Sequence, residues 1–237
     1  MVLGIAMTLQ GLSVVLPALN EEKNVEQAIL SARDAAMTVA DAYEVIVVDD
    51  GSTDDTADRA RRAGARVVSH GDNRGYGAAL RSGFQAAQQP WIFQMDCDNQ
   101  FDPREIKKLV ELAPDAQLVI GIRSDRADSW KRRAAGRAWN RLCRLTFGYL
   151  AQDIDCGFKL LNREAVASLP LESNGACISV ELCIAARAAG YRIRETPVGH
   201  YPRTTGTPTG LRPRVVLKGL RELYELRRRY GRHPRTK

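Results

Sequence analysis

The chain has 237 residues, of which 44% are hydrophobic and 27% are charged, so it can bury one substantial α/β core. Its five cysteines include no Cys-x-x-Cys pair, which argues against a zinc ribbon or a disulfide framework and favours reduced thiols in a cytoplasmic protein. The net charge of +7 is uneven: residues 1–122 carry 11 Lys and Arg against 18 Asp and Glu, and residues 123–237 carry 24 against 10. This asymmetry favours a polyanionic partner.

The N-terminal 20 residues are uncharged but do not read as a targeting segment. They lack a basic region, and Gln10 and Gly11 interrupt the apolar run. We expect a lead-in over residues 1–11, or a translation start near Met7. No run of 18 apolar residues occurs, so a transmembrane helix is not expected.

Strands and helices are predicted to alternate through residue 122. The apolar run over residues 12–17 predicts a buried strand, and Asn20 is expected to cap a helix reaching about Ala40. Further strands are predicted at 44–50, 65–69, 91–95 and 118–122, with helices ending near 63 and spanning 78–88 and 104–112. This order predicts an α/β fold with a doubly wound, mostly parallel sheet. Ligands bind at the carboxyl ends of such strands, where residues 17–20, 49–52 and 96–100 should meet.

The basic half is less regular. One helix carries an arginine stripe (133, 137, 141 and 144), and residues 160–169 suggest a return to the core. A helix at 180–189, an edge strand at 192–198 and a loop at 203–213 follow. Residues 211–237 are expected to form a basic helical extension, whose helix at 214–230 has one side with Val216, Leu220 and Leu223 and another with Arg214, Lys218, Arg221 and Arg228.

Asp96, Asp98 and Gln100 alternate along an extended segment, so their side chains can converge on one side. Two carboxylates held this close repel each other unless a cation or a proton lies between them. Mg²⁺ or Mn²⁺, with open positions for phosphate oxygens, satisfies that requirement. The alternative is a solvated acidic turn at the end of a strand.

Two segments, residues 15–22 and 47–54, resemble the opening of the family 2 glycosyltransferases with the A-type fold. Residues 73–78, 96–103 and 155–160 resemble the dolichyl-phosphate mannosyltransferase, or polyprenyl-phosphate glycosyltransferase, branch of that family. The same branch is suggested by residues 121–123, Glu181, residues 195–198, Arg203 and Gly206. The resemblance implies one domain over residues 12–210, with a nucleotide-sugar half (12–122) and an acceptor half (123–210).

The resemblance implies inverting, metal-dependent transfer of a sugar from GDP-mannose or a UDP-hexose to a polyprenyl phosphate. It implies nucleotide-sugar binding by Pro17, Ala18, Asn20, Glu21, Asp49, Asp50, Ser52, Gly75, Asp96, Arg123 and one of Arg132 or Arg133, with Arg133 preferred. It implies metal binding by Asp96, Asp98 and Gln100, and catalytic roles for Asp98, Asp155, Glu181 and Arg203. Asp155 and Glu181 are the carboxylates available as a general base, or else they cap helices or pair with arginines.

Several alternatives remain open at this point. One alternative keeps the chemistry but uses a soluble hydroxyl compound or a carrier-bound intermediate as the acceptor. A second alternative, a nucleic-acid-binding module, would explain the basic half but not the acidic clusters, so nucleic acid is not expected as a partner. The branch usually has Ser-Lys where this chain has Thr207-Pro208, which puts a phosphate-binding lysine in doubt. The C-terminal spans of many members are also missing from the sequence. Helix 214–230 either rests on an anionic inner membrane surface, making the protein peripheral there, or packs on the domain.

Overall fold

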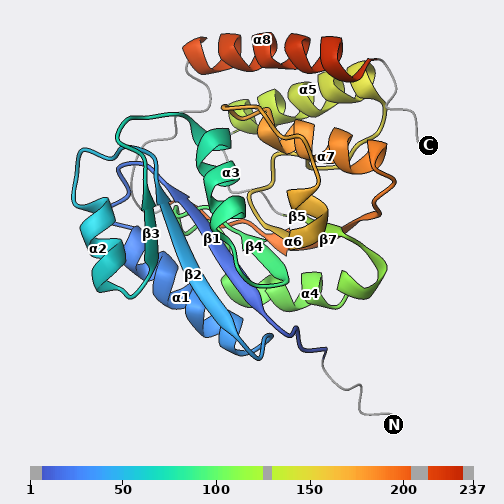
Figure 1. Cartoon of the computed structure of the whole chain (residues 1–237). Helices are drawn as coiled ribbons and strands as arrows, with labels where there is room; N and C mark the ends of the chain where they lie inside the picture. The colour runs from blue at the N-terminus through green and yellow to red at the C-terminus, as the bar shows by residue number, and fades with distance from the viewer. Residues whose placement is uncertain (1–6, 125–129, 204–212, 232–237) are drawn as a thin grey trace.

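The computed structural model describes residues 7–124, 130–203 and 213–231. One seven-stranded sheet has the order β3-β2-β1-β4-β6-β5-β7 (Figure 1). The strands are β1 (Leu12–Ala18), β2 (Tyr43–Asp49), β3 (Arg66–Ser69), β4 (Trp91–Gln94), β5 (Leu118–Ser124), β6 (Lys159–Asn162) and β7 (Ile193–Gly199). The α-helices are α1 (Val25–Met37), α2 (Thr56–Arg62), α3 (Tyr76–Ala86), α4 (Ile106–Val110), α5 (Trp130–Phe147), α6 (Arg163–Ala167), α7 (Ile178–Ala188) and α8 (Pro213–Tyr230), with 3₁₀ turns η1 (Pro103–Glu105) and η2 (Ala113–Asp115). Residues 204–212, with the Gly206 and Thr207-Pro208 motif positions, lie outside the described residues.

The sheet is mostly parallel, which confirms the predicted fold class. The exception is β6, which lies between β4 and β5 and is antiparallel to both. The sequence predicted only that this segment returns to the core. The last strand, β7, pairs with β5 alone and forms the edge, as predicted.

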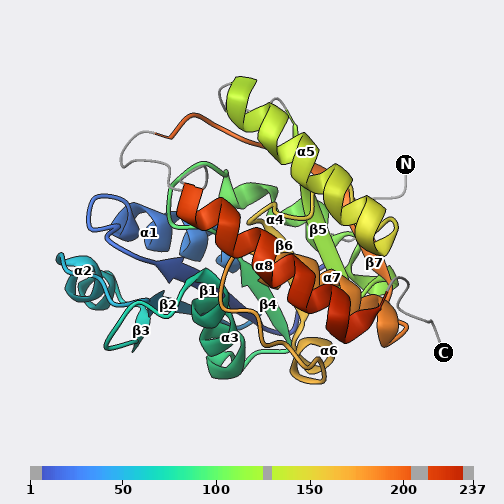
Figure 2. The ribbon, with the colours of Figure 1, turned by 90° about the horizontal axis from the view of Figure 1, so that it is seen from above.

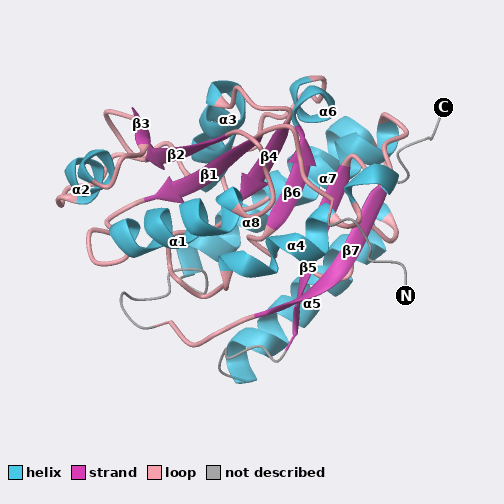
Figure 3. Ribbon diagram, turned by 90° about the horizontal axis from the view of Figure 1, so that it is seen from below, coloured by secondary structure: helices cyan, strands magenta, loops and turns pink. Residues whose placement is uncertain are grey.

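Helices cover both faces of the sheet because its central strands are apolar on both sides. In β1, Val14 and Leu16 belong to the core cluster that includes α1 and α4, whereas Val15 belongs to the cluster that includes α3, α6 and α7. Figure 3 shows α1 and α4 on one side of the sheet and α3 and α6 on the other. A Cβ at Gly83 would lie 2.3 Å from Val15 Cγ1, so glycine allows α3 to lie close to β1.

The predicted cap of the first helix is wrong. Helix α1 starts at Val25 with Asn24 at its N-cap, and Asn20 lies upstream in a left-handed conformation with φ of 54°. The Asn20 side chain instead accepts a hydrogen bond from the Thr53 backbone N–H at 2.8 Å. Its oxygen is therefore used to join the loops after β1 and β2.

The lead-in is shorter than predicted. Leu9 is buried, its N–H donates to Val39 O at 2.8 Å, and its carbonyl accepts from the Asp41 N–H at 2.9 Å. These bonds attach Leu9 to the segment after α1, so the part of the lead-in from Leu9 onward belongs to the folded core.

Helices α5 and α8 lie side by side on the outermost side of the molecule (Figures 1 and 2). Gly219 of α8 faces the Trp139 ring of α5, and Leu223 and Leu226 of α8 are buried. The predicted faces of α8 are therefore wrong in part: Leu223 points inward, but Val216 and Leu220 are exposed. Within the described parts of the chain, no helix has the length and apolar character needed to cross a bilayer.

Candidate active site

A cavity of about 820 Å³ lies at the carboxyl ends of β1 and β2 and beyond β4. The strand register explains this convergence, because Ala18 at the end of β1 pairs with Asp49 at the end of β2, and β4 lies on the other side of β1. Helices α5 and α8 close the opposite wall. The predicted site residues that line the cavity are Pro17, Ala18, Asn20, Glu21, Asp50, Gly75, Asp96, Asp98, Arg123, Asp155 and Arg203.

Asp96 follows β4 and is held by two neighbours. The Tyr76 hydroxyl donates to Asp96 Oδ1 at 2.9 Å, and the Gln94 amide donates to that hydroxyl at 3.2 Å. A Cβ at Gly157 would lie 2.1 Å from Asp96 Oδ2, so only glycine leaves room for the carboxylate. Burial and then the charge of Asp98 raise the pKa of Asp96 to about 6.

Asp98 forms an ion pair with a side chain of the protein, Arg203. Arg203 Nη2 donates to Asp98 Oδ2 at 2.7 Å, and Arg203 Nη1 lies 3.7 Å from Glu21 Oε1. Burial is the main reason why the pKa of Glu21 is raised. The carboxylates of Asp98 and Glu21 thus lie beside one guanidinium group, which supplies positive charge to an acidic wall.

The donor set fits a divalent cation whose coordination is completed by substrate. Among the described residues, no three His, Cys, Asp or Glu side chains gather closely enough to hold a metal by themselves. Asp96 and Asp98 nevertheless both line the cavity, and Mg²⁺ commonly binds one or two carboxylates together with substrate phosphates. Gln100 does not line the cavity: its amide donates to Tyr201 O at 3.0 Å, so in this conformation it supports the neighbouring segment instead.

Asp49 and Asp50, the two carboxylates at the end of β2, differ in whether they line the cavity. Asp49 lies outside the cavity and accepts from the Ser52 N–H at 3.1 Å, so it shapes the turn, and Ser52 in turn accepts from the Asn20 N–H at 2.8 Å. Asp50 lines the cavity and accepts from the backbone N–H groups of Arg74 and Gly75, at 2.9 and 2.8 Å. Of the pair, only Asp50 is presented to a ligand.

His70 orients Asp50 from behind and was not predicted from the sequence. Its Nδ1 lies 2.7 Å from Asp50 Oδ1, and its Nε2 lies 2.9 Å from Ser82 Oγ. The imidazole is buried, so it restricts the rotation of the carboxylate. No sequence motif marked this residue, because the contact joins the end of β3 to the end of β2.

The arginines on the basic wall are distributed differently from the prediction. Arg123 lines the cavity but is bound by Asp153 through two hydrogen bonds of 2.7 and 2.6 Å. Burial alone would lower the pKa of Arg123, but the Asp153 carboxylate raises it above its usual value. Of the α5 pair, Arg132 lines the cavity, and Arg133, the preferred candidate, is exposed and does not.

Glu181, predicted as catalytic, instead makes contacts that hold the structure together. It is fully buried in the first turn of α7, outside the cavity, where its Oε2 accepts from the backbone N–H groups of Glu172 and Ser173 at 2.9 and 2.7 Å. Its other oxygen pairs with Arg229 of α8. The carboxylate therefore connects a loop to α8 and does not reach a ligand in the cavity. Asp155 is the one of the two candidate bases that lines it.

Helix α8 contributes cavity residues that the sequence did not indicate. Lys218 and Glu222 line the wall opposite the strand ends, together with Val215 and Gly219. A Cβ at Gly75 would lie 2.3 Å from Asn174 O and 3.5 Å from Lys218 Nζ, so the glycine lets three segments meet. Because α8 is far from the other motifs in the sequence, only its packing on the domain reveals this role.

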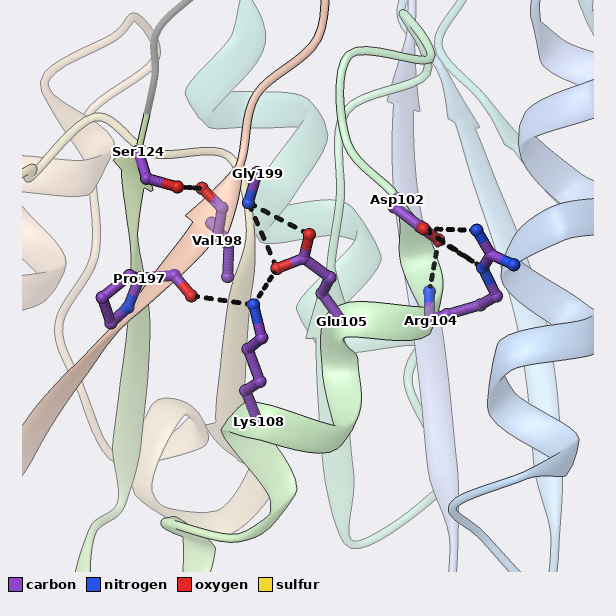
Figure 4. Close-up of polar contacts among 8 residues, drawn as sticks. All are labelled: Asp102, Arg104, Glu105, Lys108, Ser124, Pro197, Val198 and Gly199. Carbon is purple, nitrogen blue, oxygen red and sulfur yellow. Dashed lines mark hydrogen bonds and ion pairs between the residues drawn. The ribbon is translucent and has the colours of Figure 1, made fainter.

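The segment that leads to Arg203 is fixed at the end of β7 (Figure 4). The Gly199 N–H donates to the Glu105 carboxylate at 3.2 and 3.1 Å, and the Ser124 hydroxyl donates to Val198 O at 2.9 Å. Tyr201 N–H then donates to Gln100 O at 2.8 Å. These bonds carry the chain from the sheet edge to the Asp-x-Asp segment and place Arg203 over Asp98.

Comparison with known proteins agrees with this geometry. The family model described as Glycosyl transferase family 2 matches residues 13–169, which is more than half of the chain. Undecaprenyl-phosphate 4-deoxy-4-formamido-L-arabinose transferase of Edwardsiella ictaluri (strain 93-146) is 35% identical over 206 residues. That match covers 84% of this chain and 62% of the relative, so the chain spans less than two thirds of the relative's length.

Solved structures of glucosyl-3-phosphoglycerate synthase from Mycobacterium tuberculosis are also similar. The complex with Mn²⁺ and UDP-glucose has a TM-score of 0.73 and 26% identity, and the match covers 94% of this chain and 79% of that one. The complex with phosphoglyceric acid has a TM-score of 0.71 and 27% identity, with 91% and 80% covered. The fold is thus of the glycosyltransferase A type, and the chain belongs to glycosyl transferase family 2.

Proposed function

We propose that this protein transfers a sugar from a nucleotide-diphosphate sugar, GDP-mannose or a UDP-hexose, to a polyprenyl phosphate with inversion. The observation that carries the proposal is the polarity of the cavity. Carboxylates at the strand ends face cations from β5, α5, the segment after β7 and α8, namely Arg123, Arg132, Arg203 and Lys218. Such a cavity suits a ligand with a nucleoside on one side and phosphates in the middle.

The nucleoside would lie against the loops after β1, β2 and β3. Asp50 is held by two backbone N–H groups and by His70, so its orientation is set before a ligand arrives. A carboxylate in this position can accept hydrogen bonds from the donors of a base or a ribose. Asn20, Pro17 and Ala18 would form the remainder of this subsite.

The diphosphate would lie between the Asp-x-Asp segment and the arginines. Mg²⁺ or Mn²⁺ held by Asp96 and Asp98 would neutralise charge that develops on the departing nucleotide. Support for the metal comes from the donor set and from the similar synthase solved with Mn²⁺ and UDP-glucose. Arg203, fixed by the end of β7, would hold a phosphate oxygen and limit the access of water.

The acceptor would enter beside α5 and α8. A polyprenyl phosphate is already an anionic nucleophile, so it needs cations for positioning and no strong base. Lys218 and Arg132 line that wall, so Lys218 of α8 would take the place of the lysine that the Thr207-Pro208 sequence lacks. The name of the 35% identical relative, an undecaprenyl-phosphate sugar transferase, supports this acceptor class.

A second candidate keeps the donor chemistry but uses a soluble hydroxyl acceptor. The similar mycobacterial synthase has been solved with phosphoglyceric acid, which favours this candidate. A hydroxyl nucleophile requires a general base. Because Glu181 is used by α8, that role would fall to Asp155.

Transfer assays with GDP-mannose and UDP-hexoses, with and without Mn²⁺, test the proposal when polyprenyl phosphate and small hydroxyl acceptors are supplied separately. The Asp98→Ala variant should lose activity by a factor on the order of a hundred or more. The matched control is Asp102→Ala, because Asp102 follows closely in the sequence but caps η1 outside the cavity. Full activity of Asp98→Ala, or transfer to the hydroxyl acceptors alone, would contradict the proposed reaction.

A further inference from the structure

More than half of the large apolar side chains that are exposed among the described residues lie on α5 and α8. On α8, Leu217 is 71% exposed and Tyr224 is 64% exposed, with Leu220 between them. On α5, Trp130 is 68% exposed and Leu145 is 73% exposed. Exposed single apolar residues are ordinary, but a contiguous group on neighbouring helices indicates a contact surface.

These side chains do not lie on the faces by which α5 and α8 pack on the domain. Helix α8 already packs on the domain through Leu223 and Leu226, and α5 through Cys143 and Phe147. Leu217 and Tyr224 are seven residues apart and therefore lie on one face of α8, with Leu220 near its side. The outward face is thus a second apolar face, which the domain does not cover.

The same outward surface is strongly basic. Arg221 and Arg228 of α8 and Arg137 and Arg141 of α5 are all exposed. Helix α5 contains no Asp or Glu, and the one exposed acid of α8, Glu225, pairs with Arg221 at 3.1 Å. Apolar side chains surrounded by arginines complement an anionic lipid surface, and like charges oppose the pairing of this face with a second copy.

We propose that the outer faces of α5 and α8 bind an anionic lipid bilayer, with Leu217, Tyr224, Trp130 and Leu145 in the interfacial region and the arginines at the headgroups. Tryptophan and tyrosine are favoured at that depth. The helices lie roughly parallel, since Gly219 faces Trp139 and Arg227 reaches Thr146 O about two turns further along both. The bilayer can therefore contact both at once.

The surface that we propose to bind the bilayer lies next to the cavity. The first two turns of the same two helices line the cavity with Arg132 and Lys218, while their outer faces would meet the lipid. A bound bilayer would therefore lie beside the cavity wall at which we place the acceptor phosphate. This step rests on the proposed function, whereas the binding of the bilayer needs neither donor nor acceptor and can be measured alone.

Flotation with vesicles of phosphatidylcholine, alone or with roughly one third phosphatidylglycerol, tests the proposal on the full chain. The protein should bind the anionic vesicles, and salt should weaken the binding. Leu217→Ser with Tyr224→Ser should lower the partition coefficient on the order of tenfold or more, since both side chains lose interfacial burial. Arg221→Gln with Arg228→Gln should lower it roughly thirtyfold, at about a factor of five for each charge.

Two control variants carry equivalent changes on the far helices: Met37→Ser on α1 and Arg59→Gln with Arg62→Gln on α2. All variants should keep the unfolding midpoint of the wild type and its transfer to a short, water-soluble isoprenyl phosphate. The proposal is overturned if the wild type ignores anionic vesicles, if the α8 variants bind as well as the controls, or if this face instead forms a dimer that the Leu217/Tyr224 change dissociates. Absence of transfer to any polyprenyl phosphate by the wild type, with its binding to anionic vesicles intact, would refute the proposed reaction and leave the surface proposal standing.

Discussion

Arg203 and a divalent cation should compete for Asp98. The guanidinium lies 2.7 Å from the carboxylate, and the two side chains are 22% and 12% exposed. Fully exposed pairs contribute about 0.2–1 kcal/mol, and breaking a buried pair costs about 3–5 kcal/mol. A pair with this exposure should lie between these limits, at about 1–2 kcal/mol. Since a metal must displace the arginine or share its carboxylate, Arg203→Gln should tighten the binding of Mn²⁺ by about 5- to 30-fold.

Titration calorimetry with Mn²⁺, without nucleotide, measures this effect directly. Arg104→Gln is the matched control, because Arg104 pairs with Asp102 at the same 2.7 Å but is 81% exposed. That variant should leave the Mn²⁺ affinity within about twofold of wild type. With a nucleotide sugar present, Arg203→Gln should instead weaken donor binding, since a phosphate contact is lost. An unchanged or lower Mn²⁺ affinity of Arg203→Gln would refute the competition.

Three further predictions concern the carboxylates and the glycine behind them. Glu181→Ala should lower the free energy of unfolding by about 3–5 kcal/mol in urea titrations, because two backbone N–H groups and an arginine lose their partner. The control Glu225→Ala, on the surface, should change the free energy of unfolding by less than about 1 kcal/mol. A stable Glu181→Ala protein without activity would instead indicate catalysis. The metal-free protein should lose about 2 kcal/mol of stability as pH rises from 4 to 6. The folded state, with the Asp96 pKa at about 6, binds this proton more tightly than the unfolded state does, so the stabilisation is lost as the carboxyl group ionises. Urea titrations should show no such slope for Asp96→Asn. Gly157→Ala should weaken Mn²⁺ binding by roughly 10-fold or more by displacing the Asp96 carboxylate, whereas Gly71→Ala, which has open space around its Cβ position, should not.

The acidic wall of the site could be predicted because it depends on local patterns. Alternation of apolar strands with helices indicates a parallel sheet, and a parallel sheet brings the ends of its strands to one edge. Asp50, Asp96 and Asp98 follow directly from that rule, and each lines the cavity. Gln100 obeys the same alternation but donates to Tyr201 O, since the left-handed turn at Asn99 interrupts the extended backbone.

The part of the basic wall that comes from α5 and α8 could not be predicted, because it depends on how these helices pack. Arg132 and Arg133 are adjacent, so the rotation of α5 alone decides which one faces the cavity. Glu181 and Asp155 are both carboxylates near arginines, and only the docking of α8 shows that Glu181 is already used. Lys218 reaches the site from the C-terminal helix, for which the sequence offered only an amphipathic pattern.

The antiparallel strand β6 has a consequence for how this protein can be divided. It follows residue 122 in the sequence, yet it pairs with β4, which precedes that residue, through the register of Phe93 with Leu160. A fragment ending after β5 would expose the edges of β4 and β5, and exposed edges of this kind lead to aggregation. We therefore expect the sheet to close only when about two thirds of the chain is available, and an exchange between relatives by joining fragments at residue 122 would disturb the pairing of β4 with β6. An exchange would have to keep β6 and replace only the segments around it.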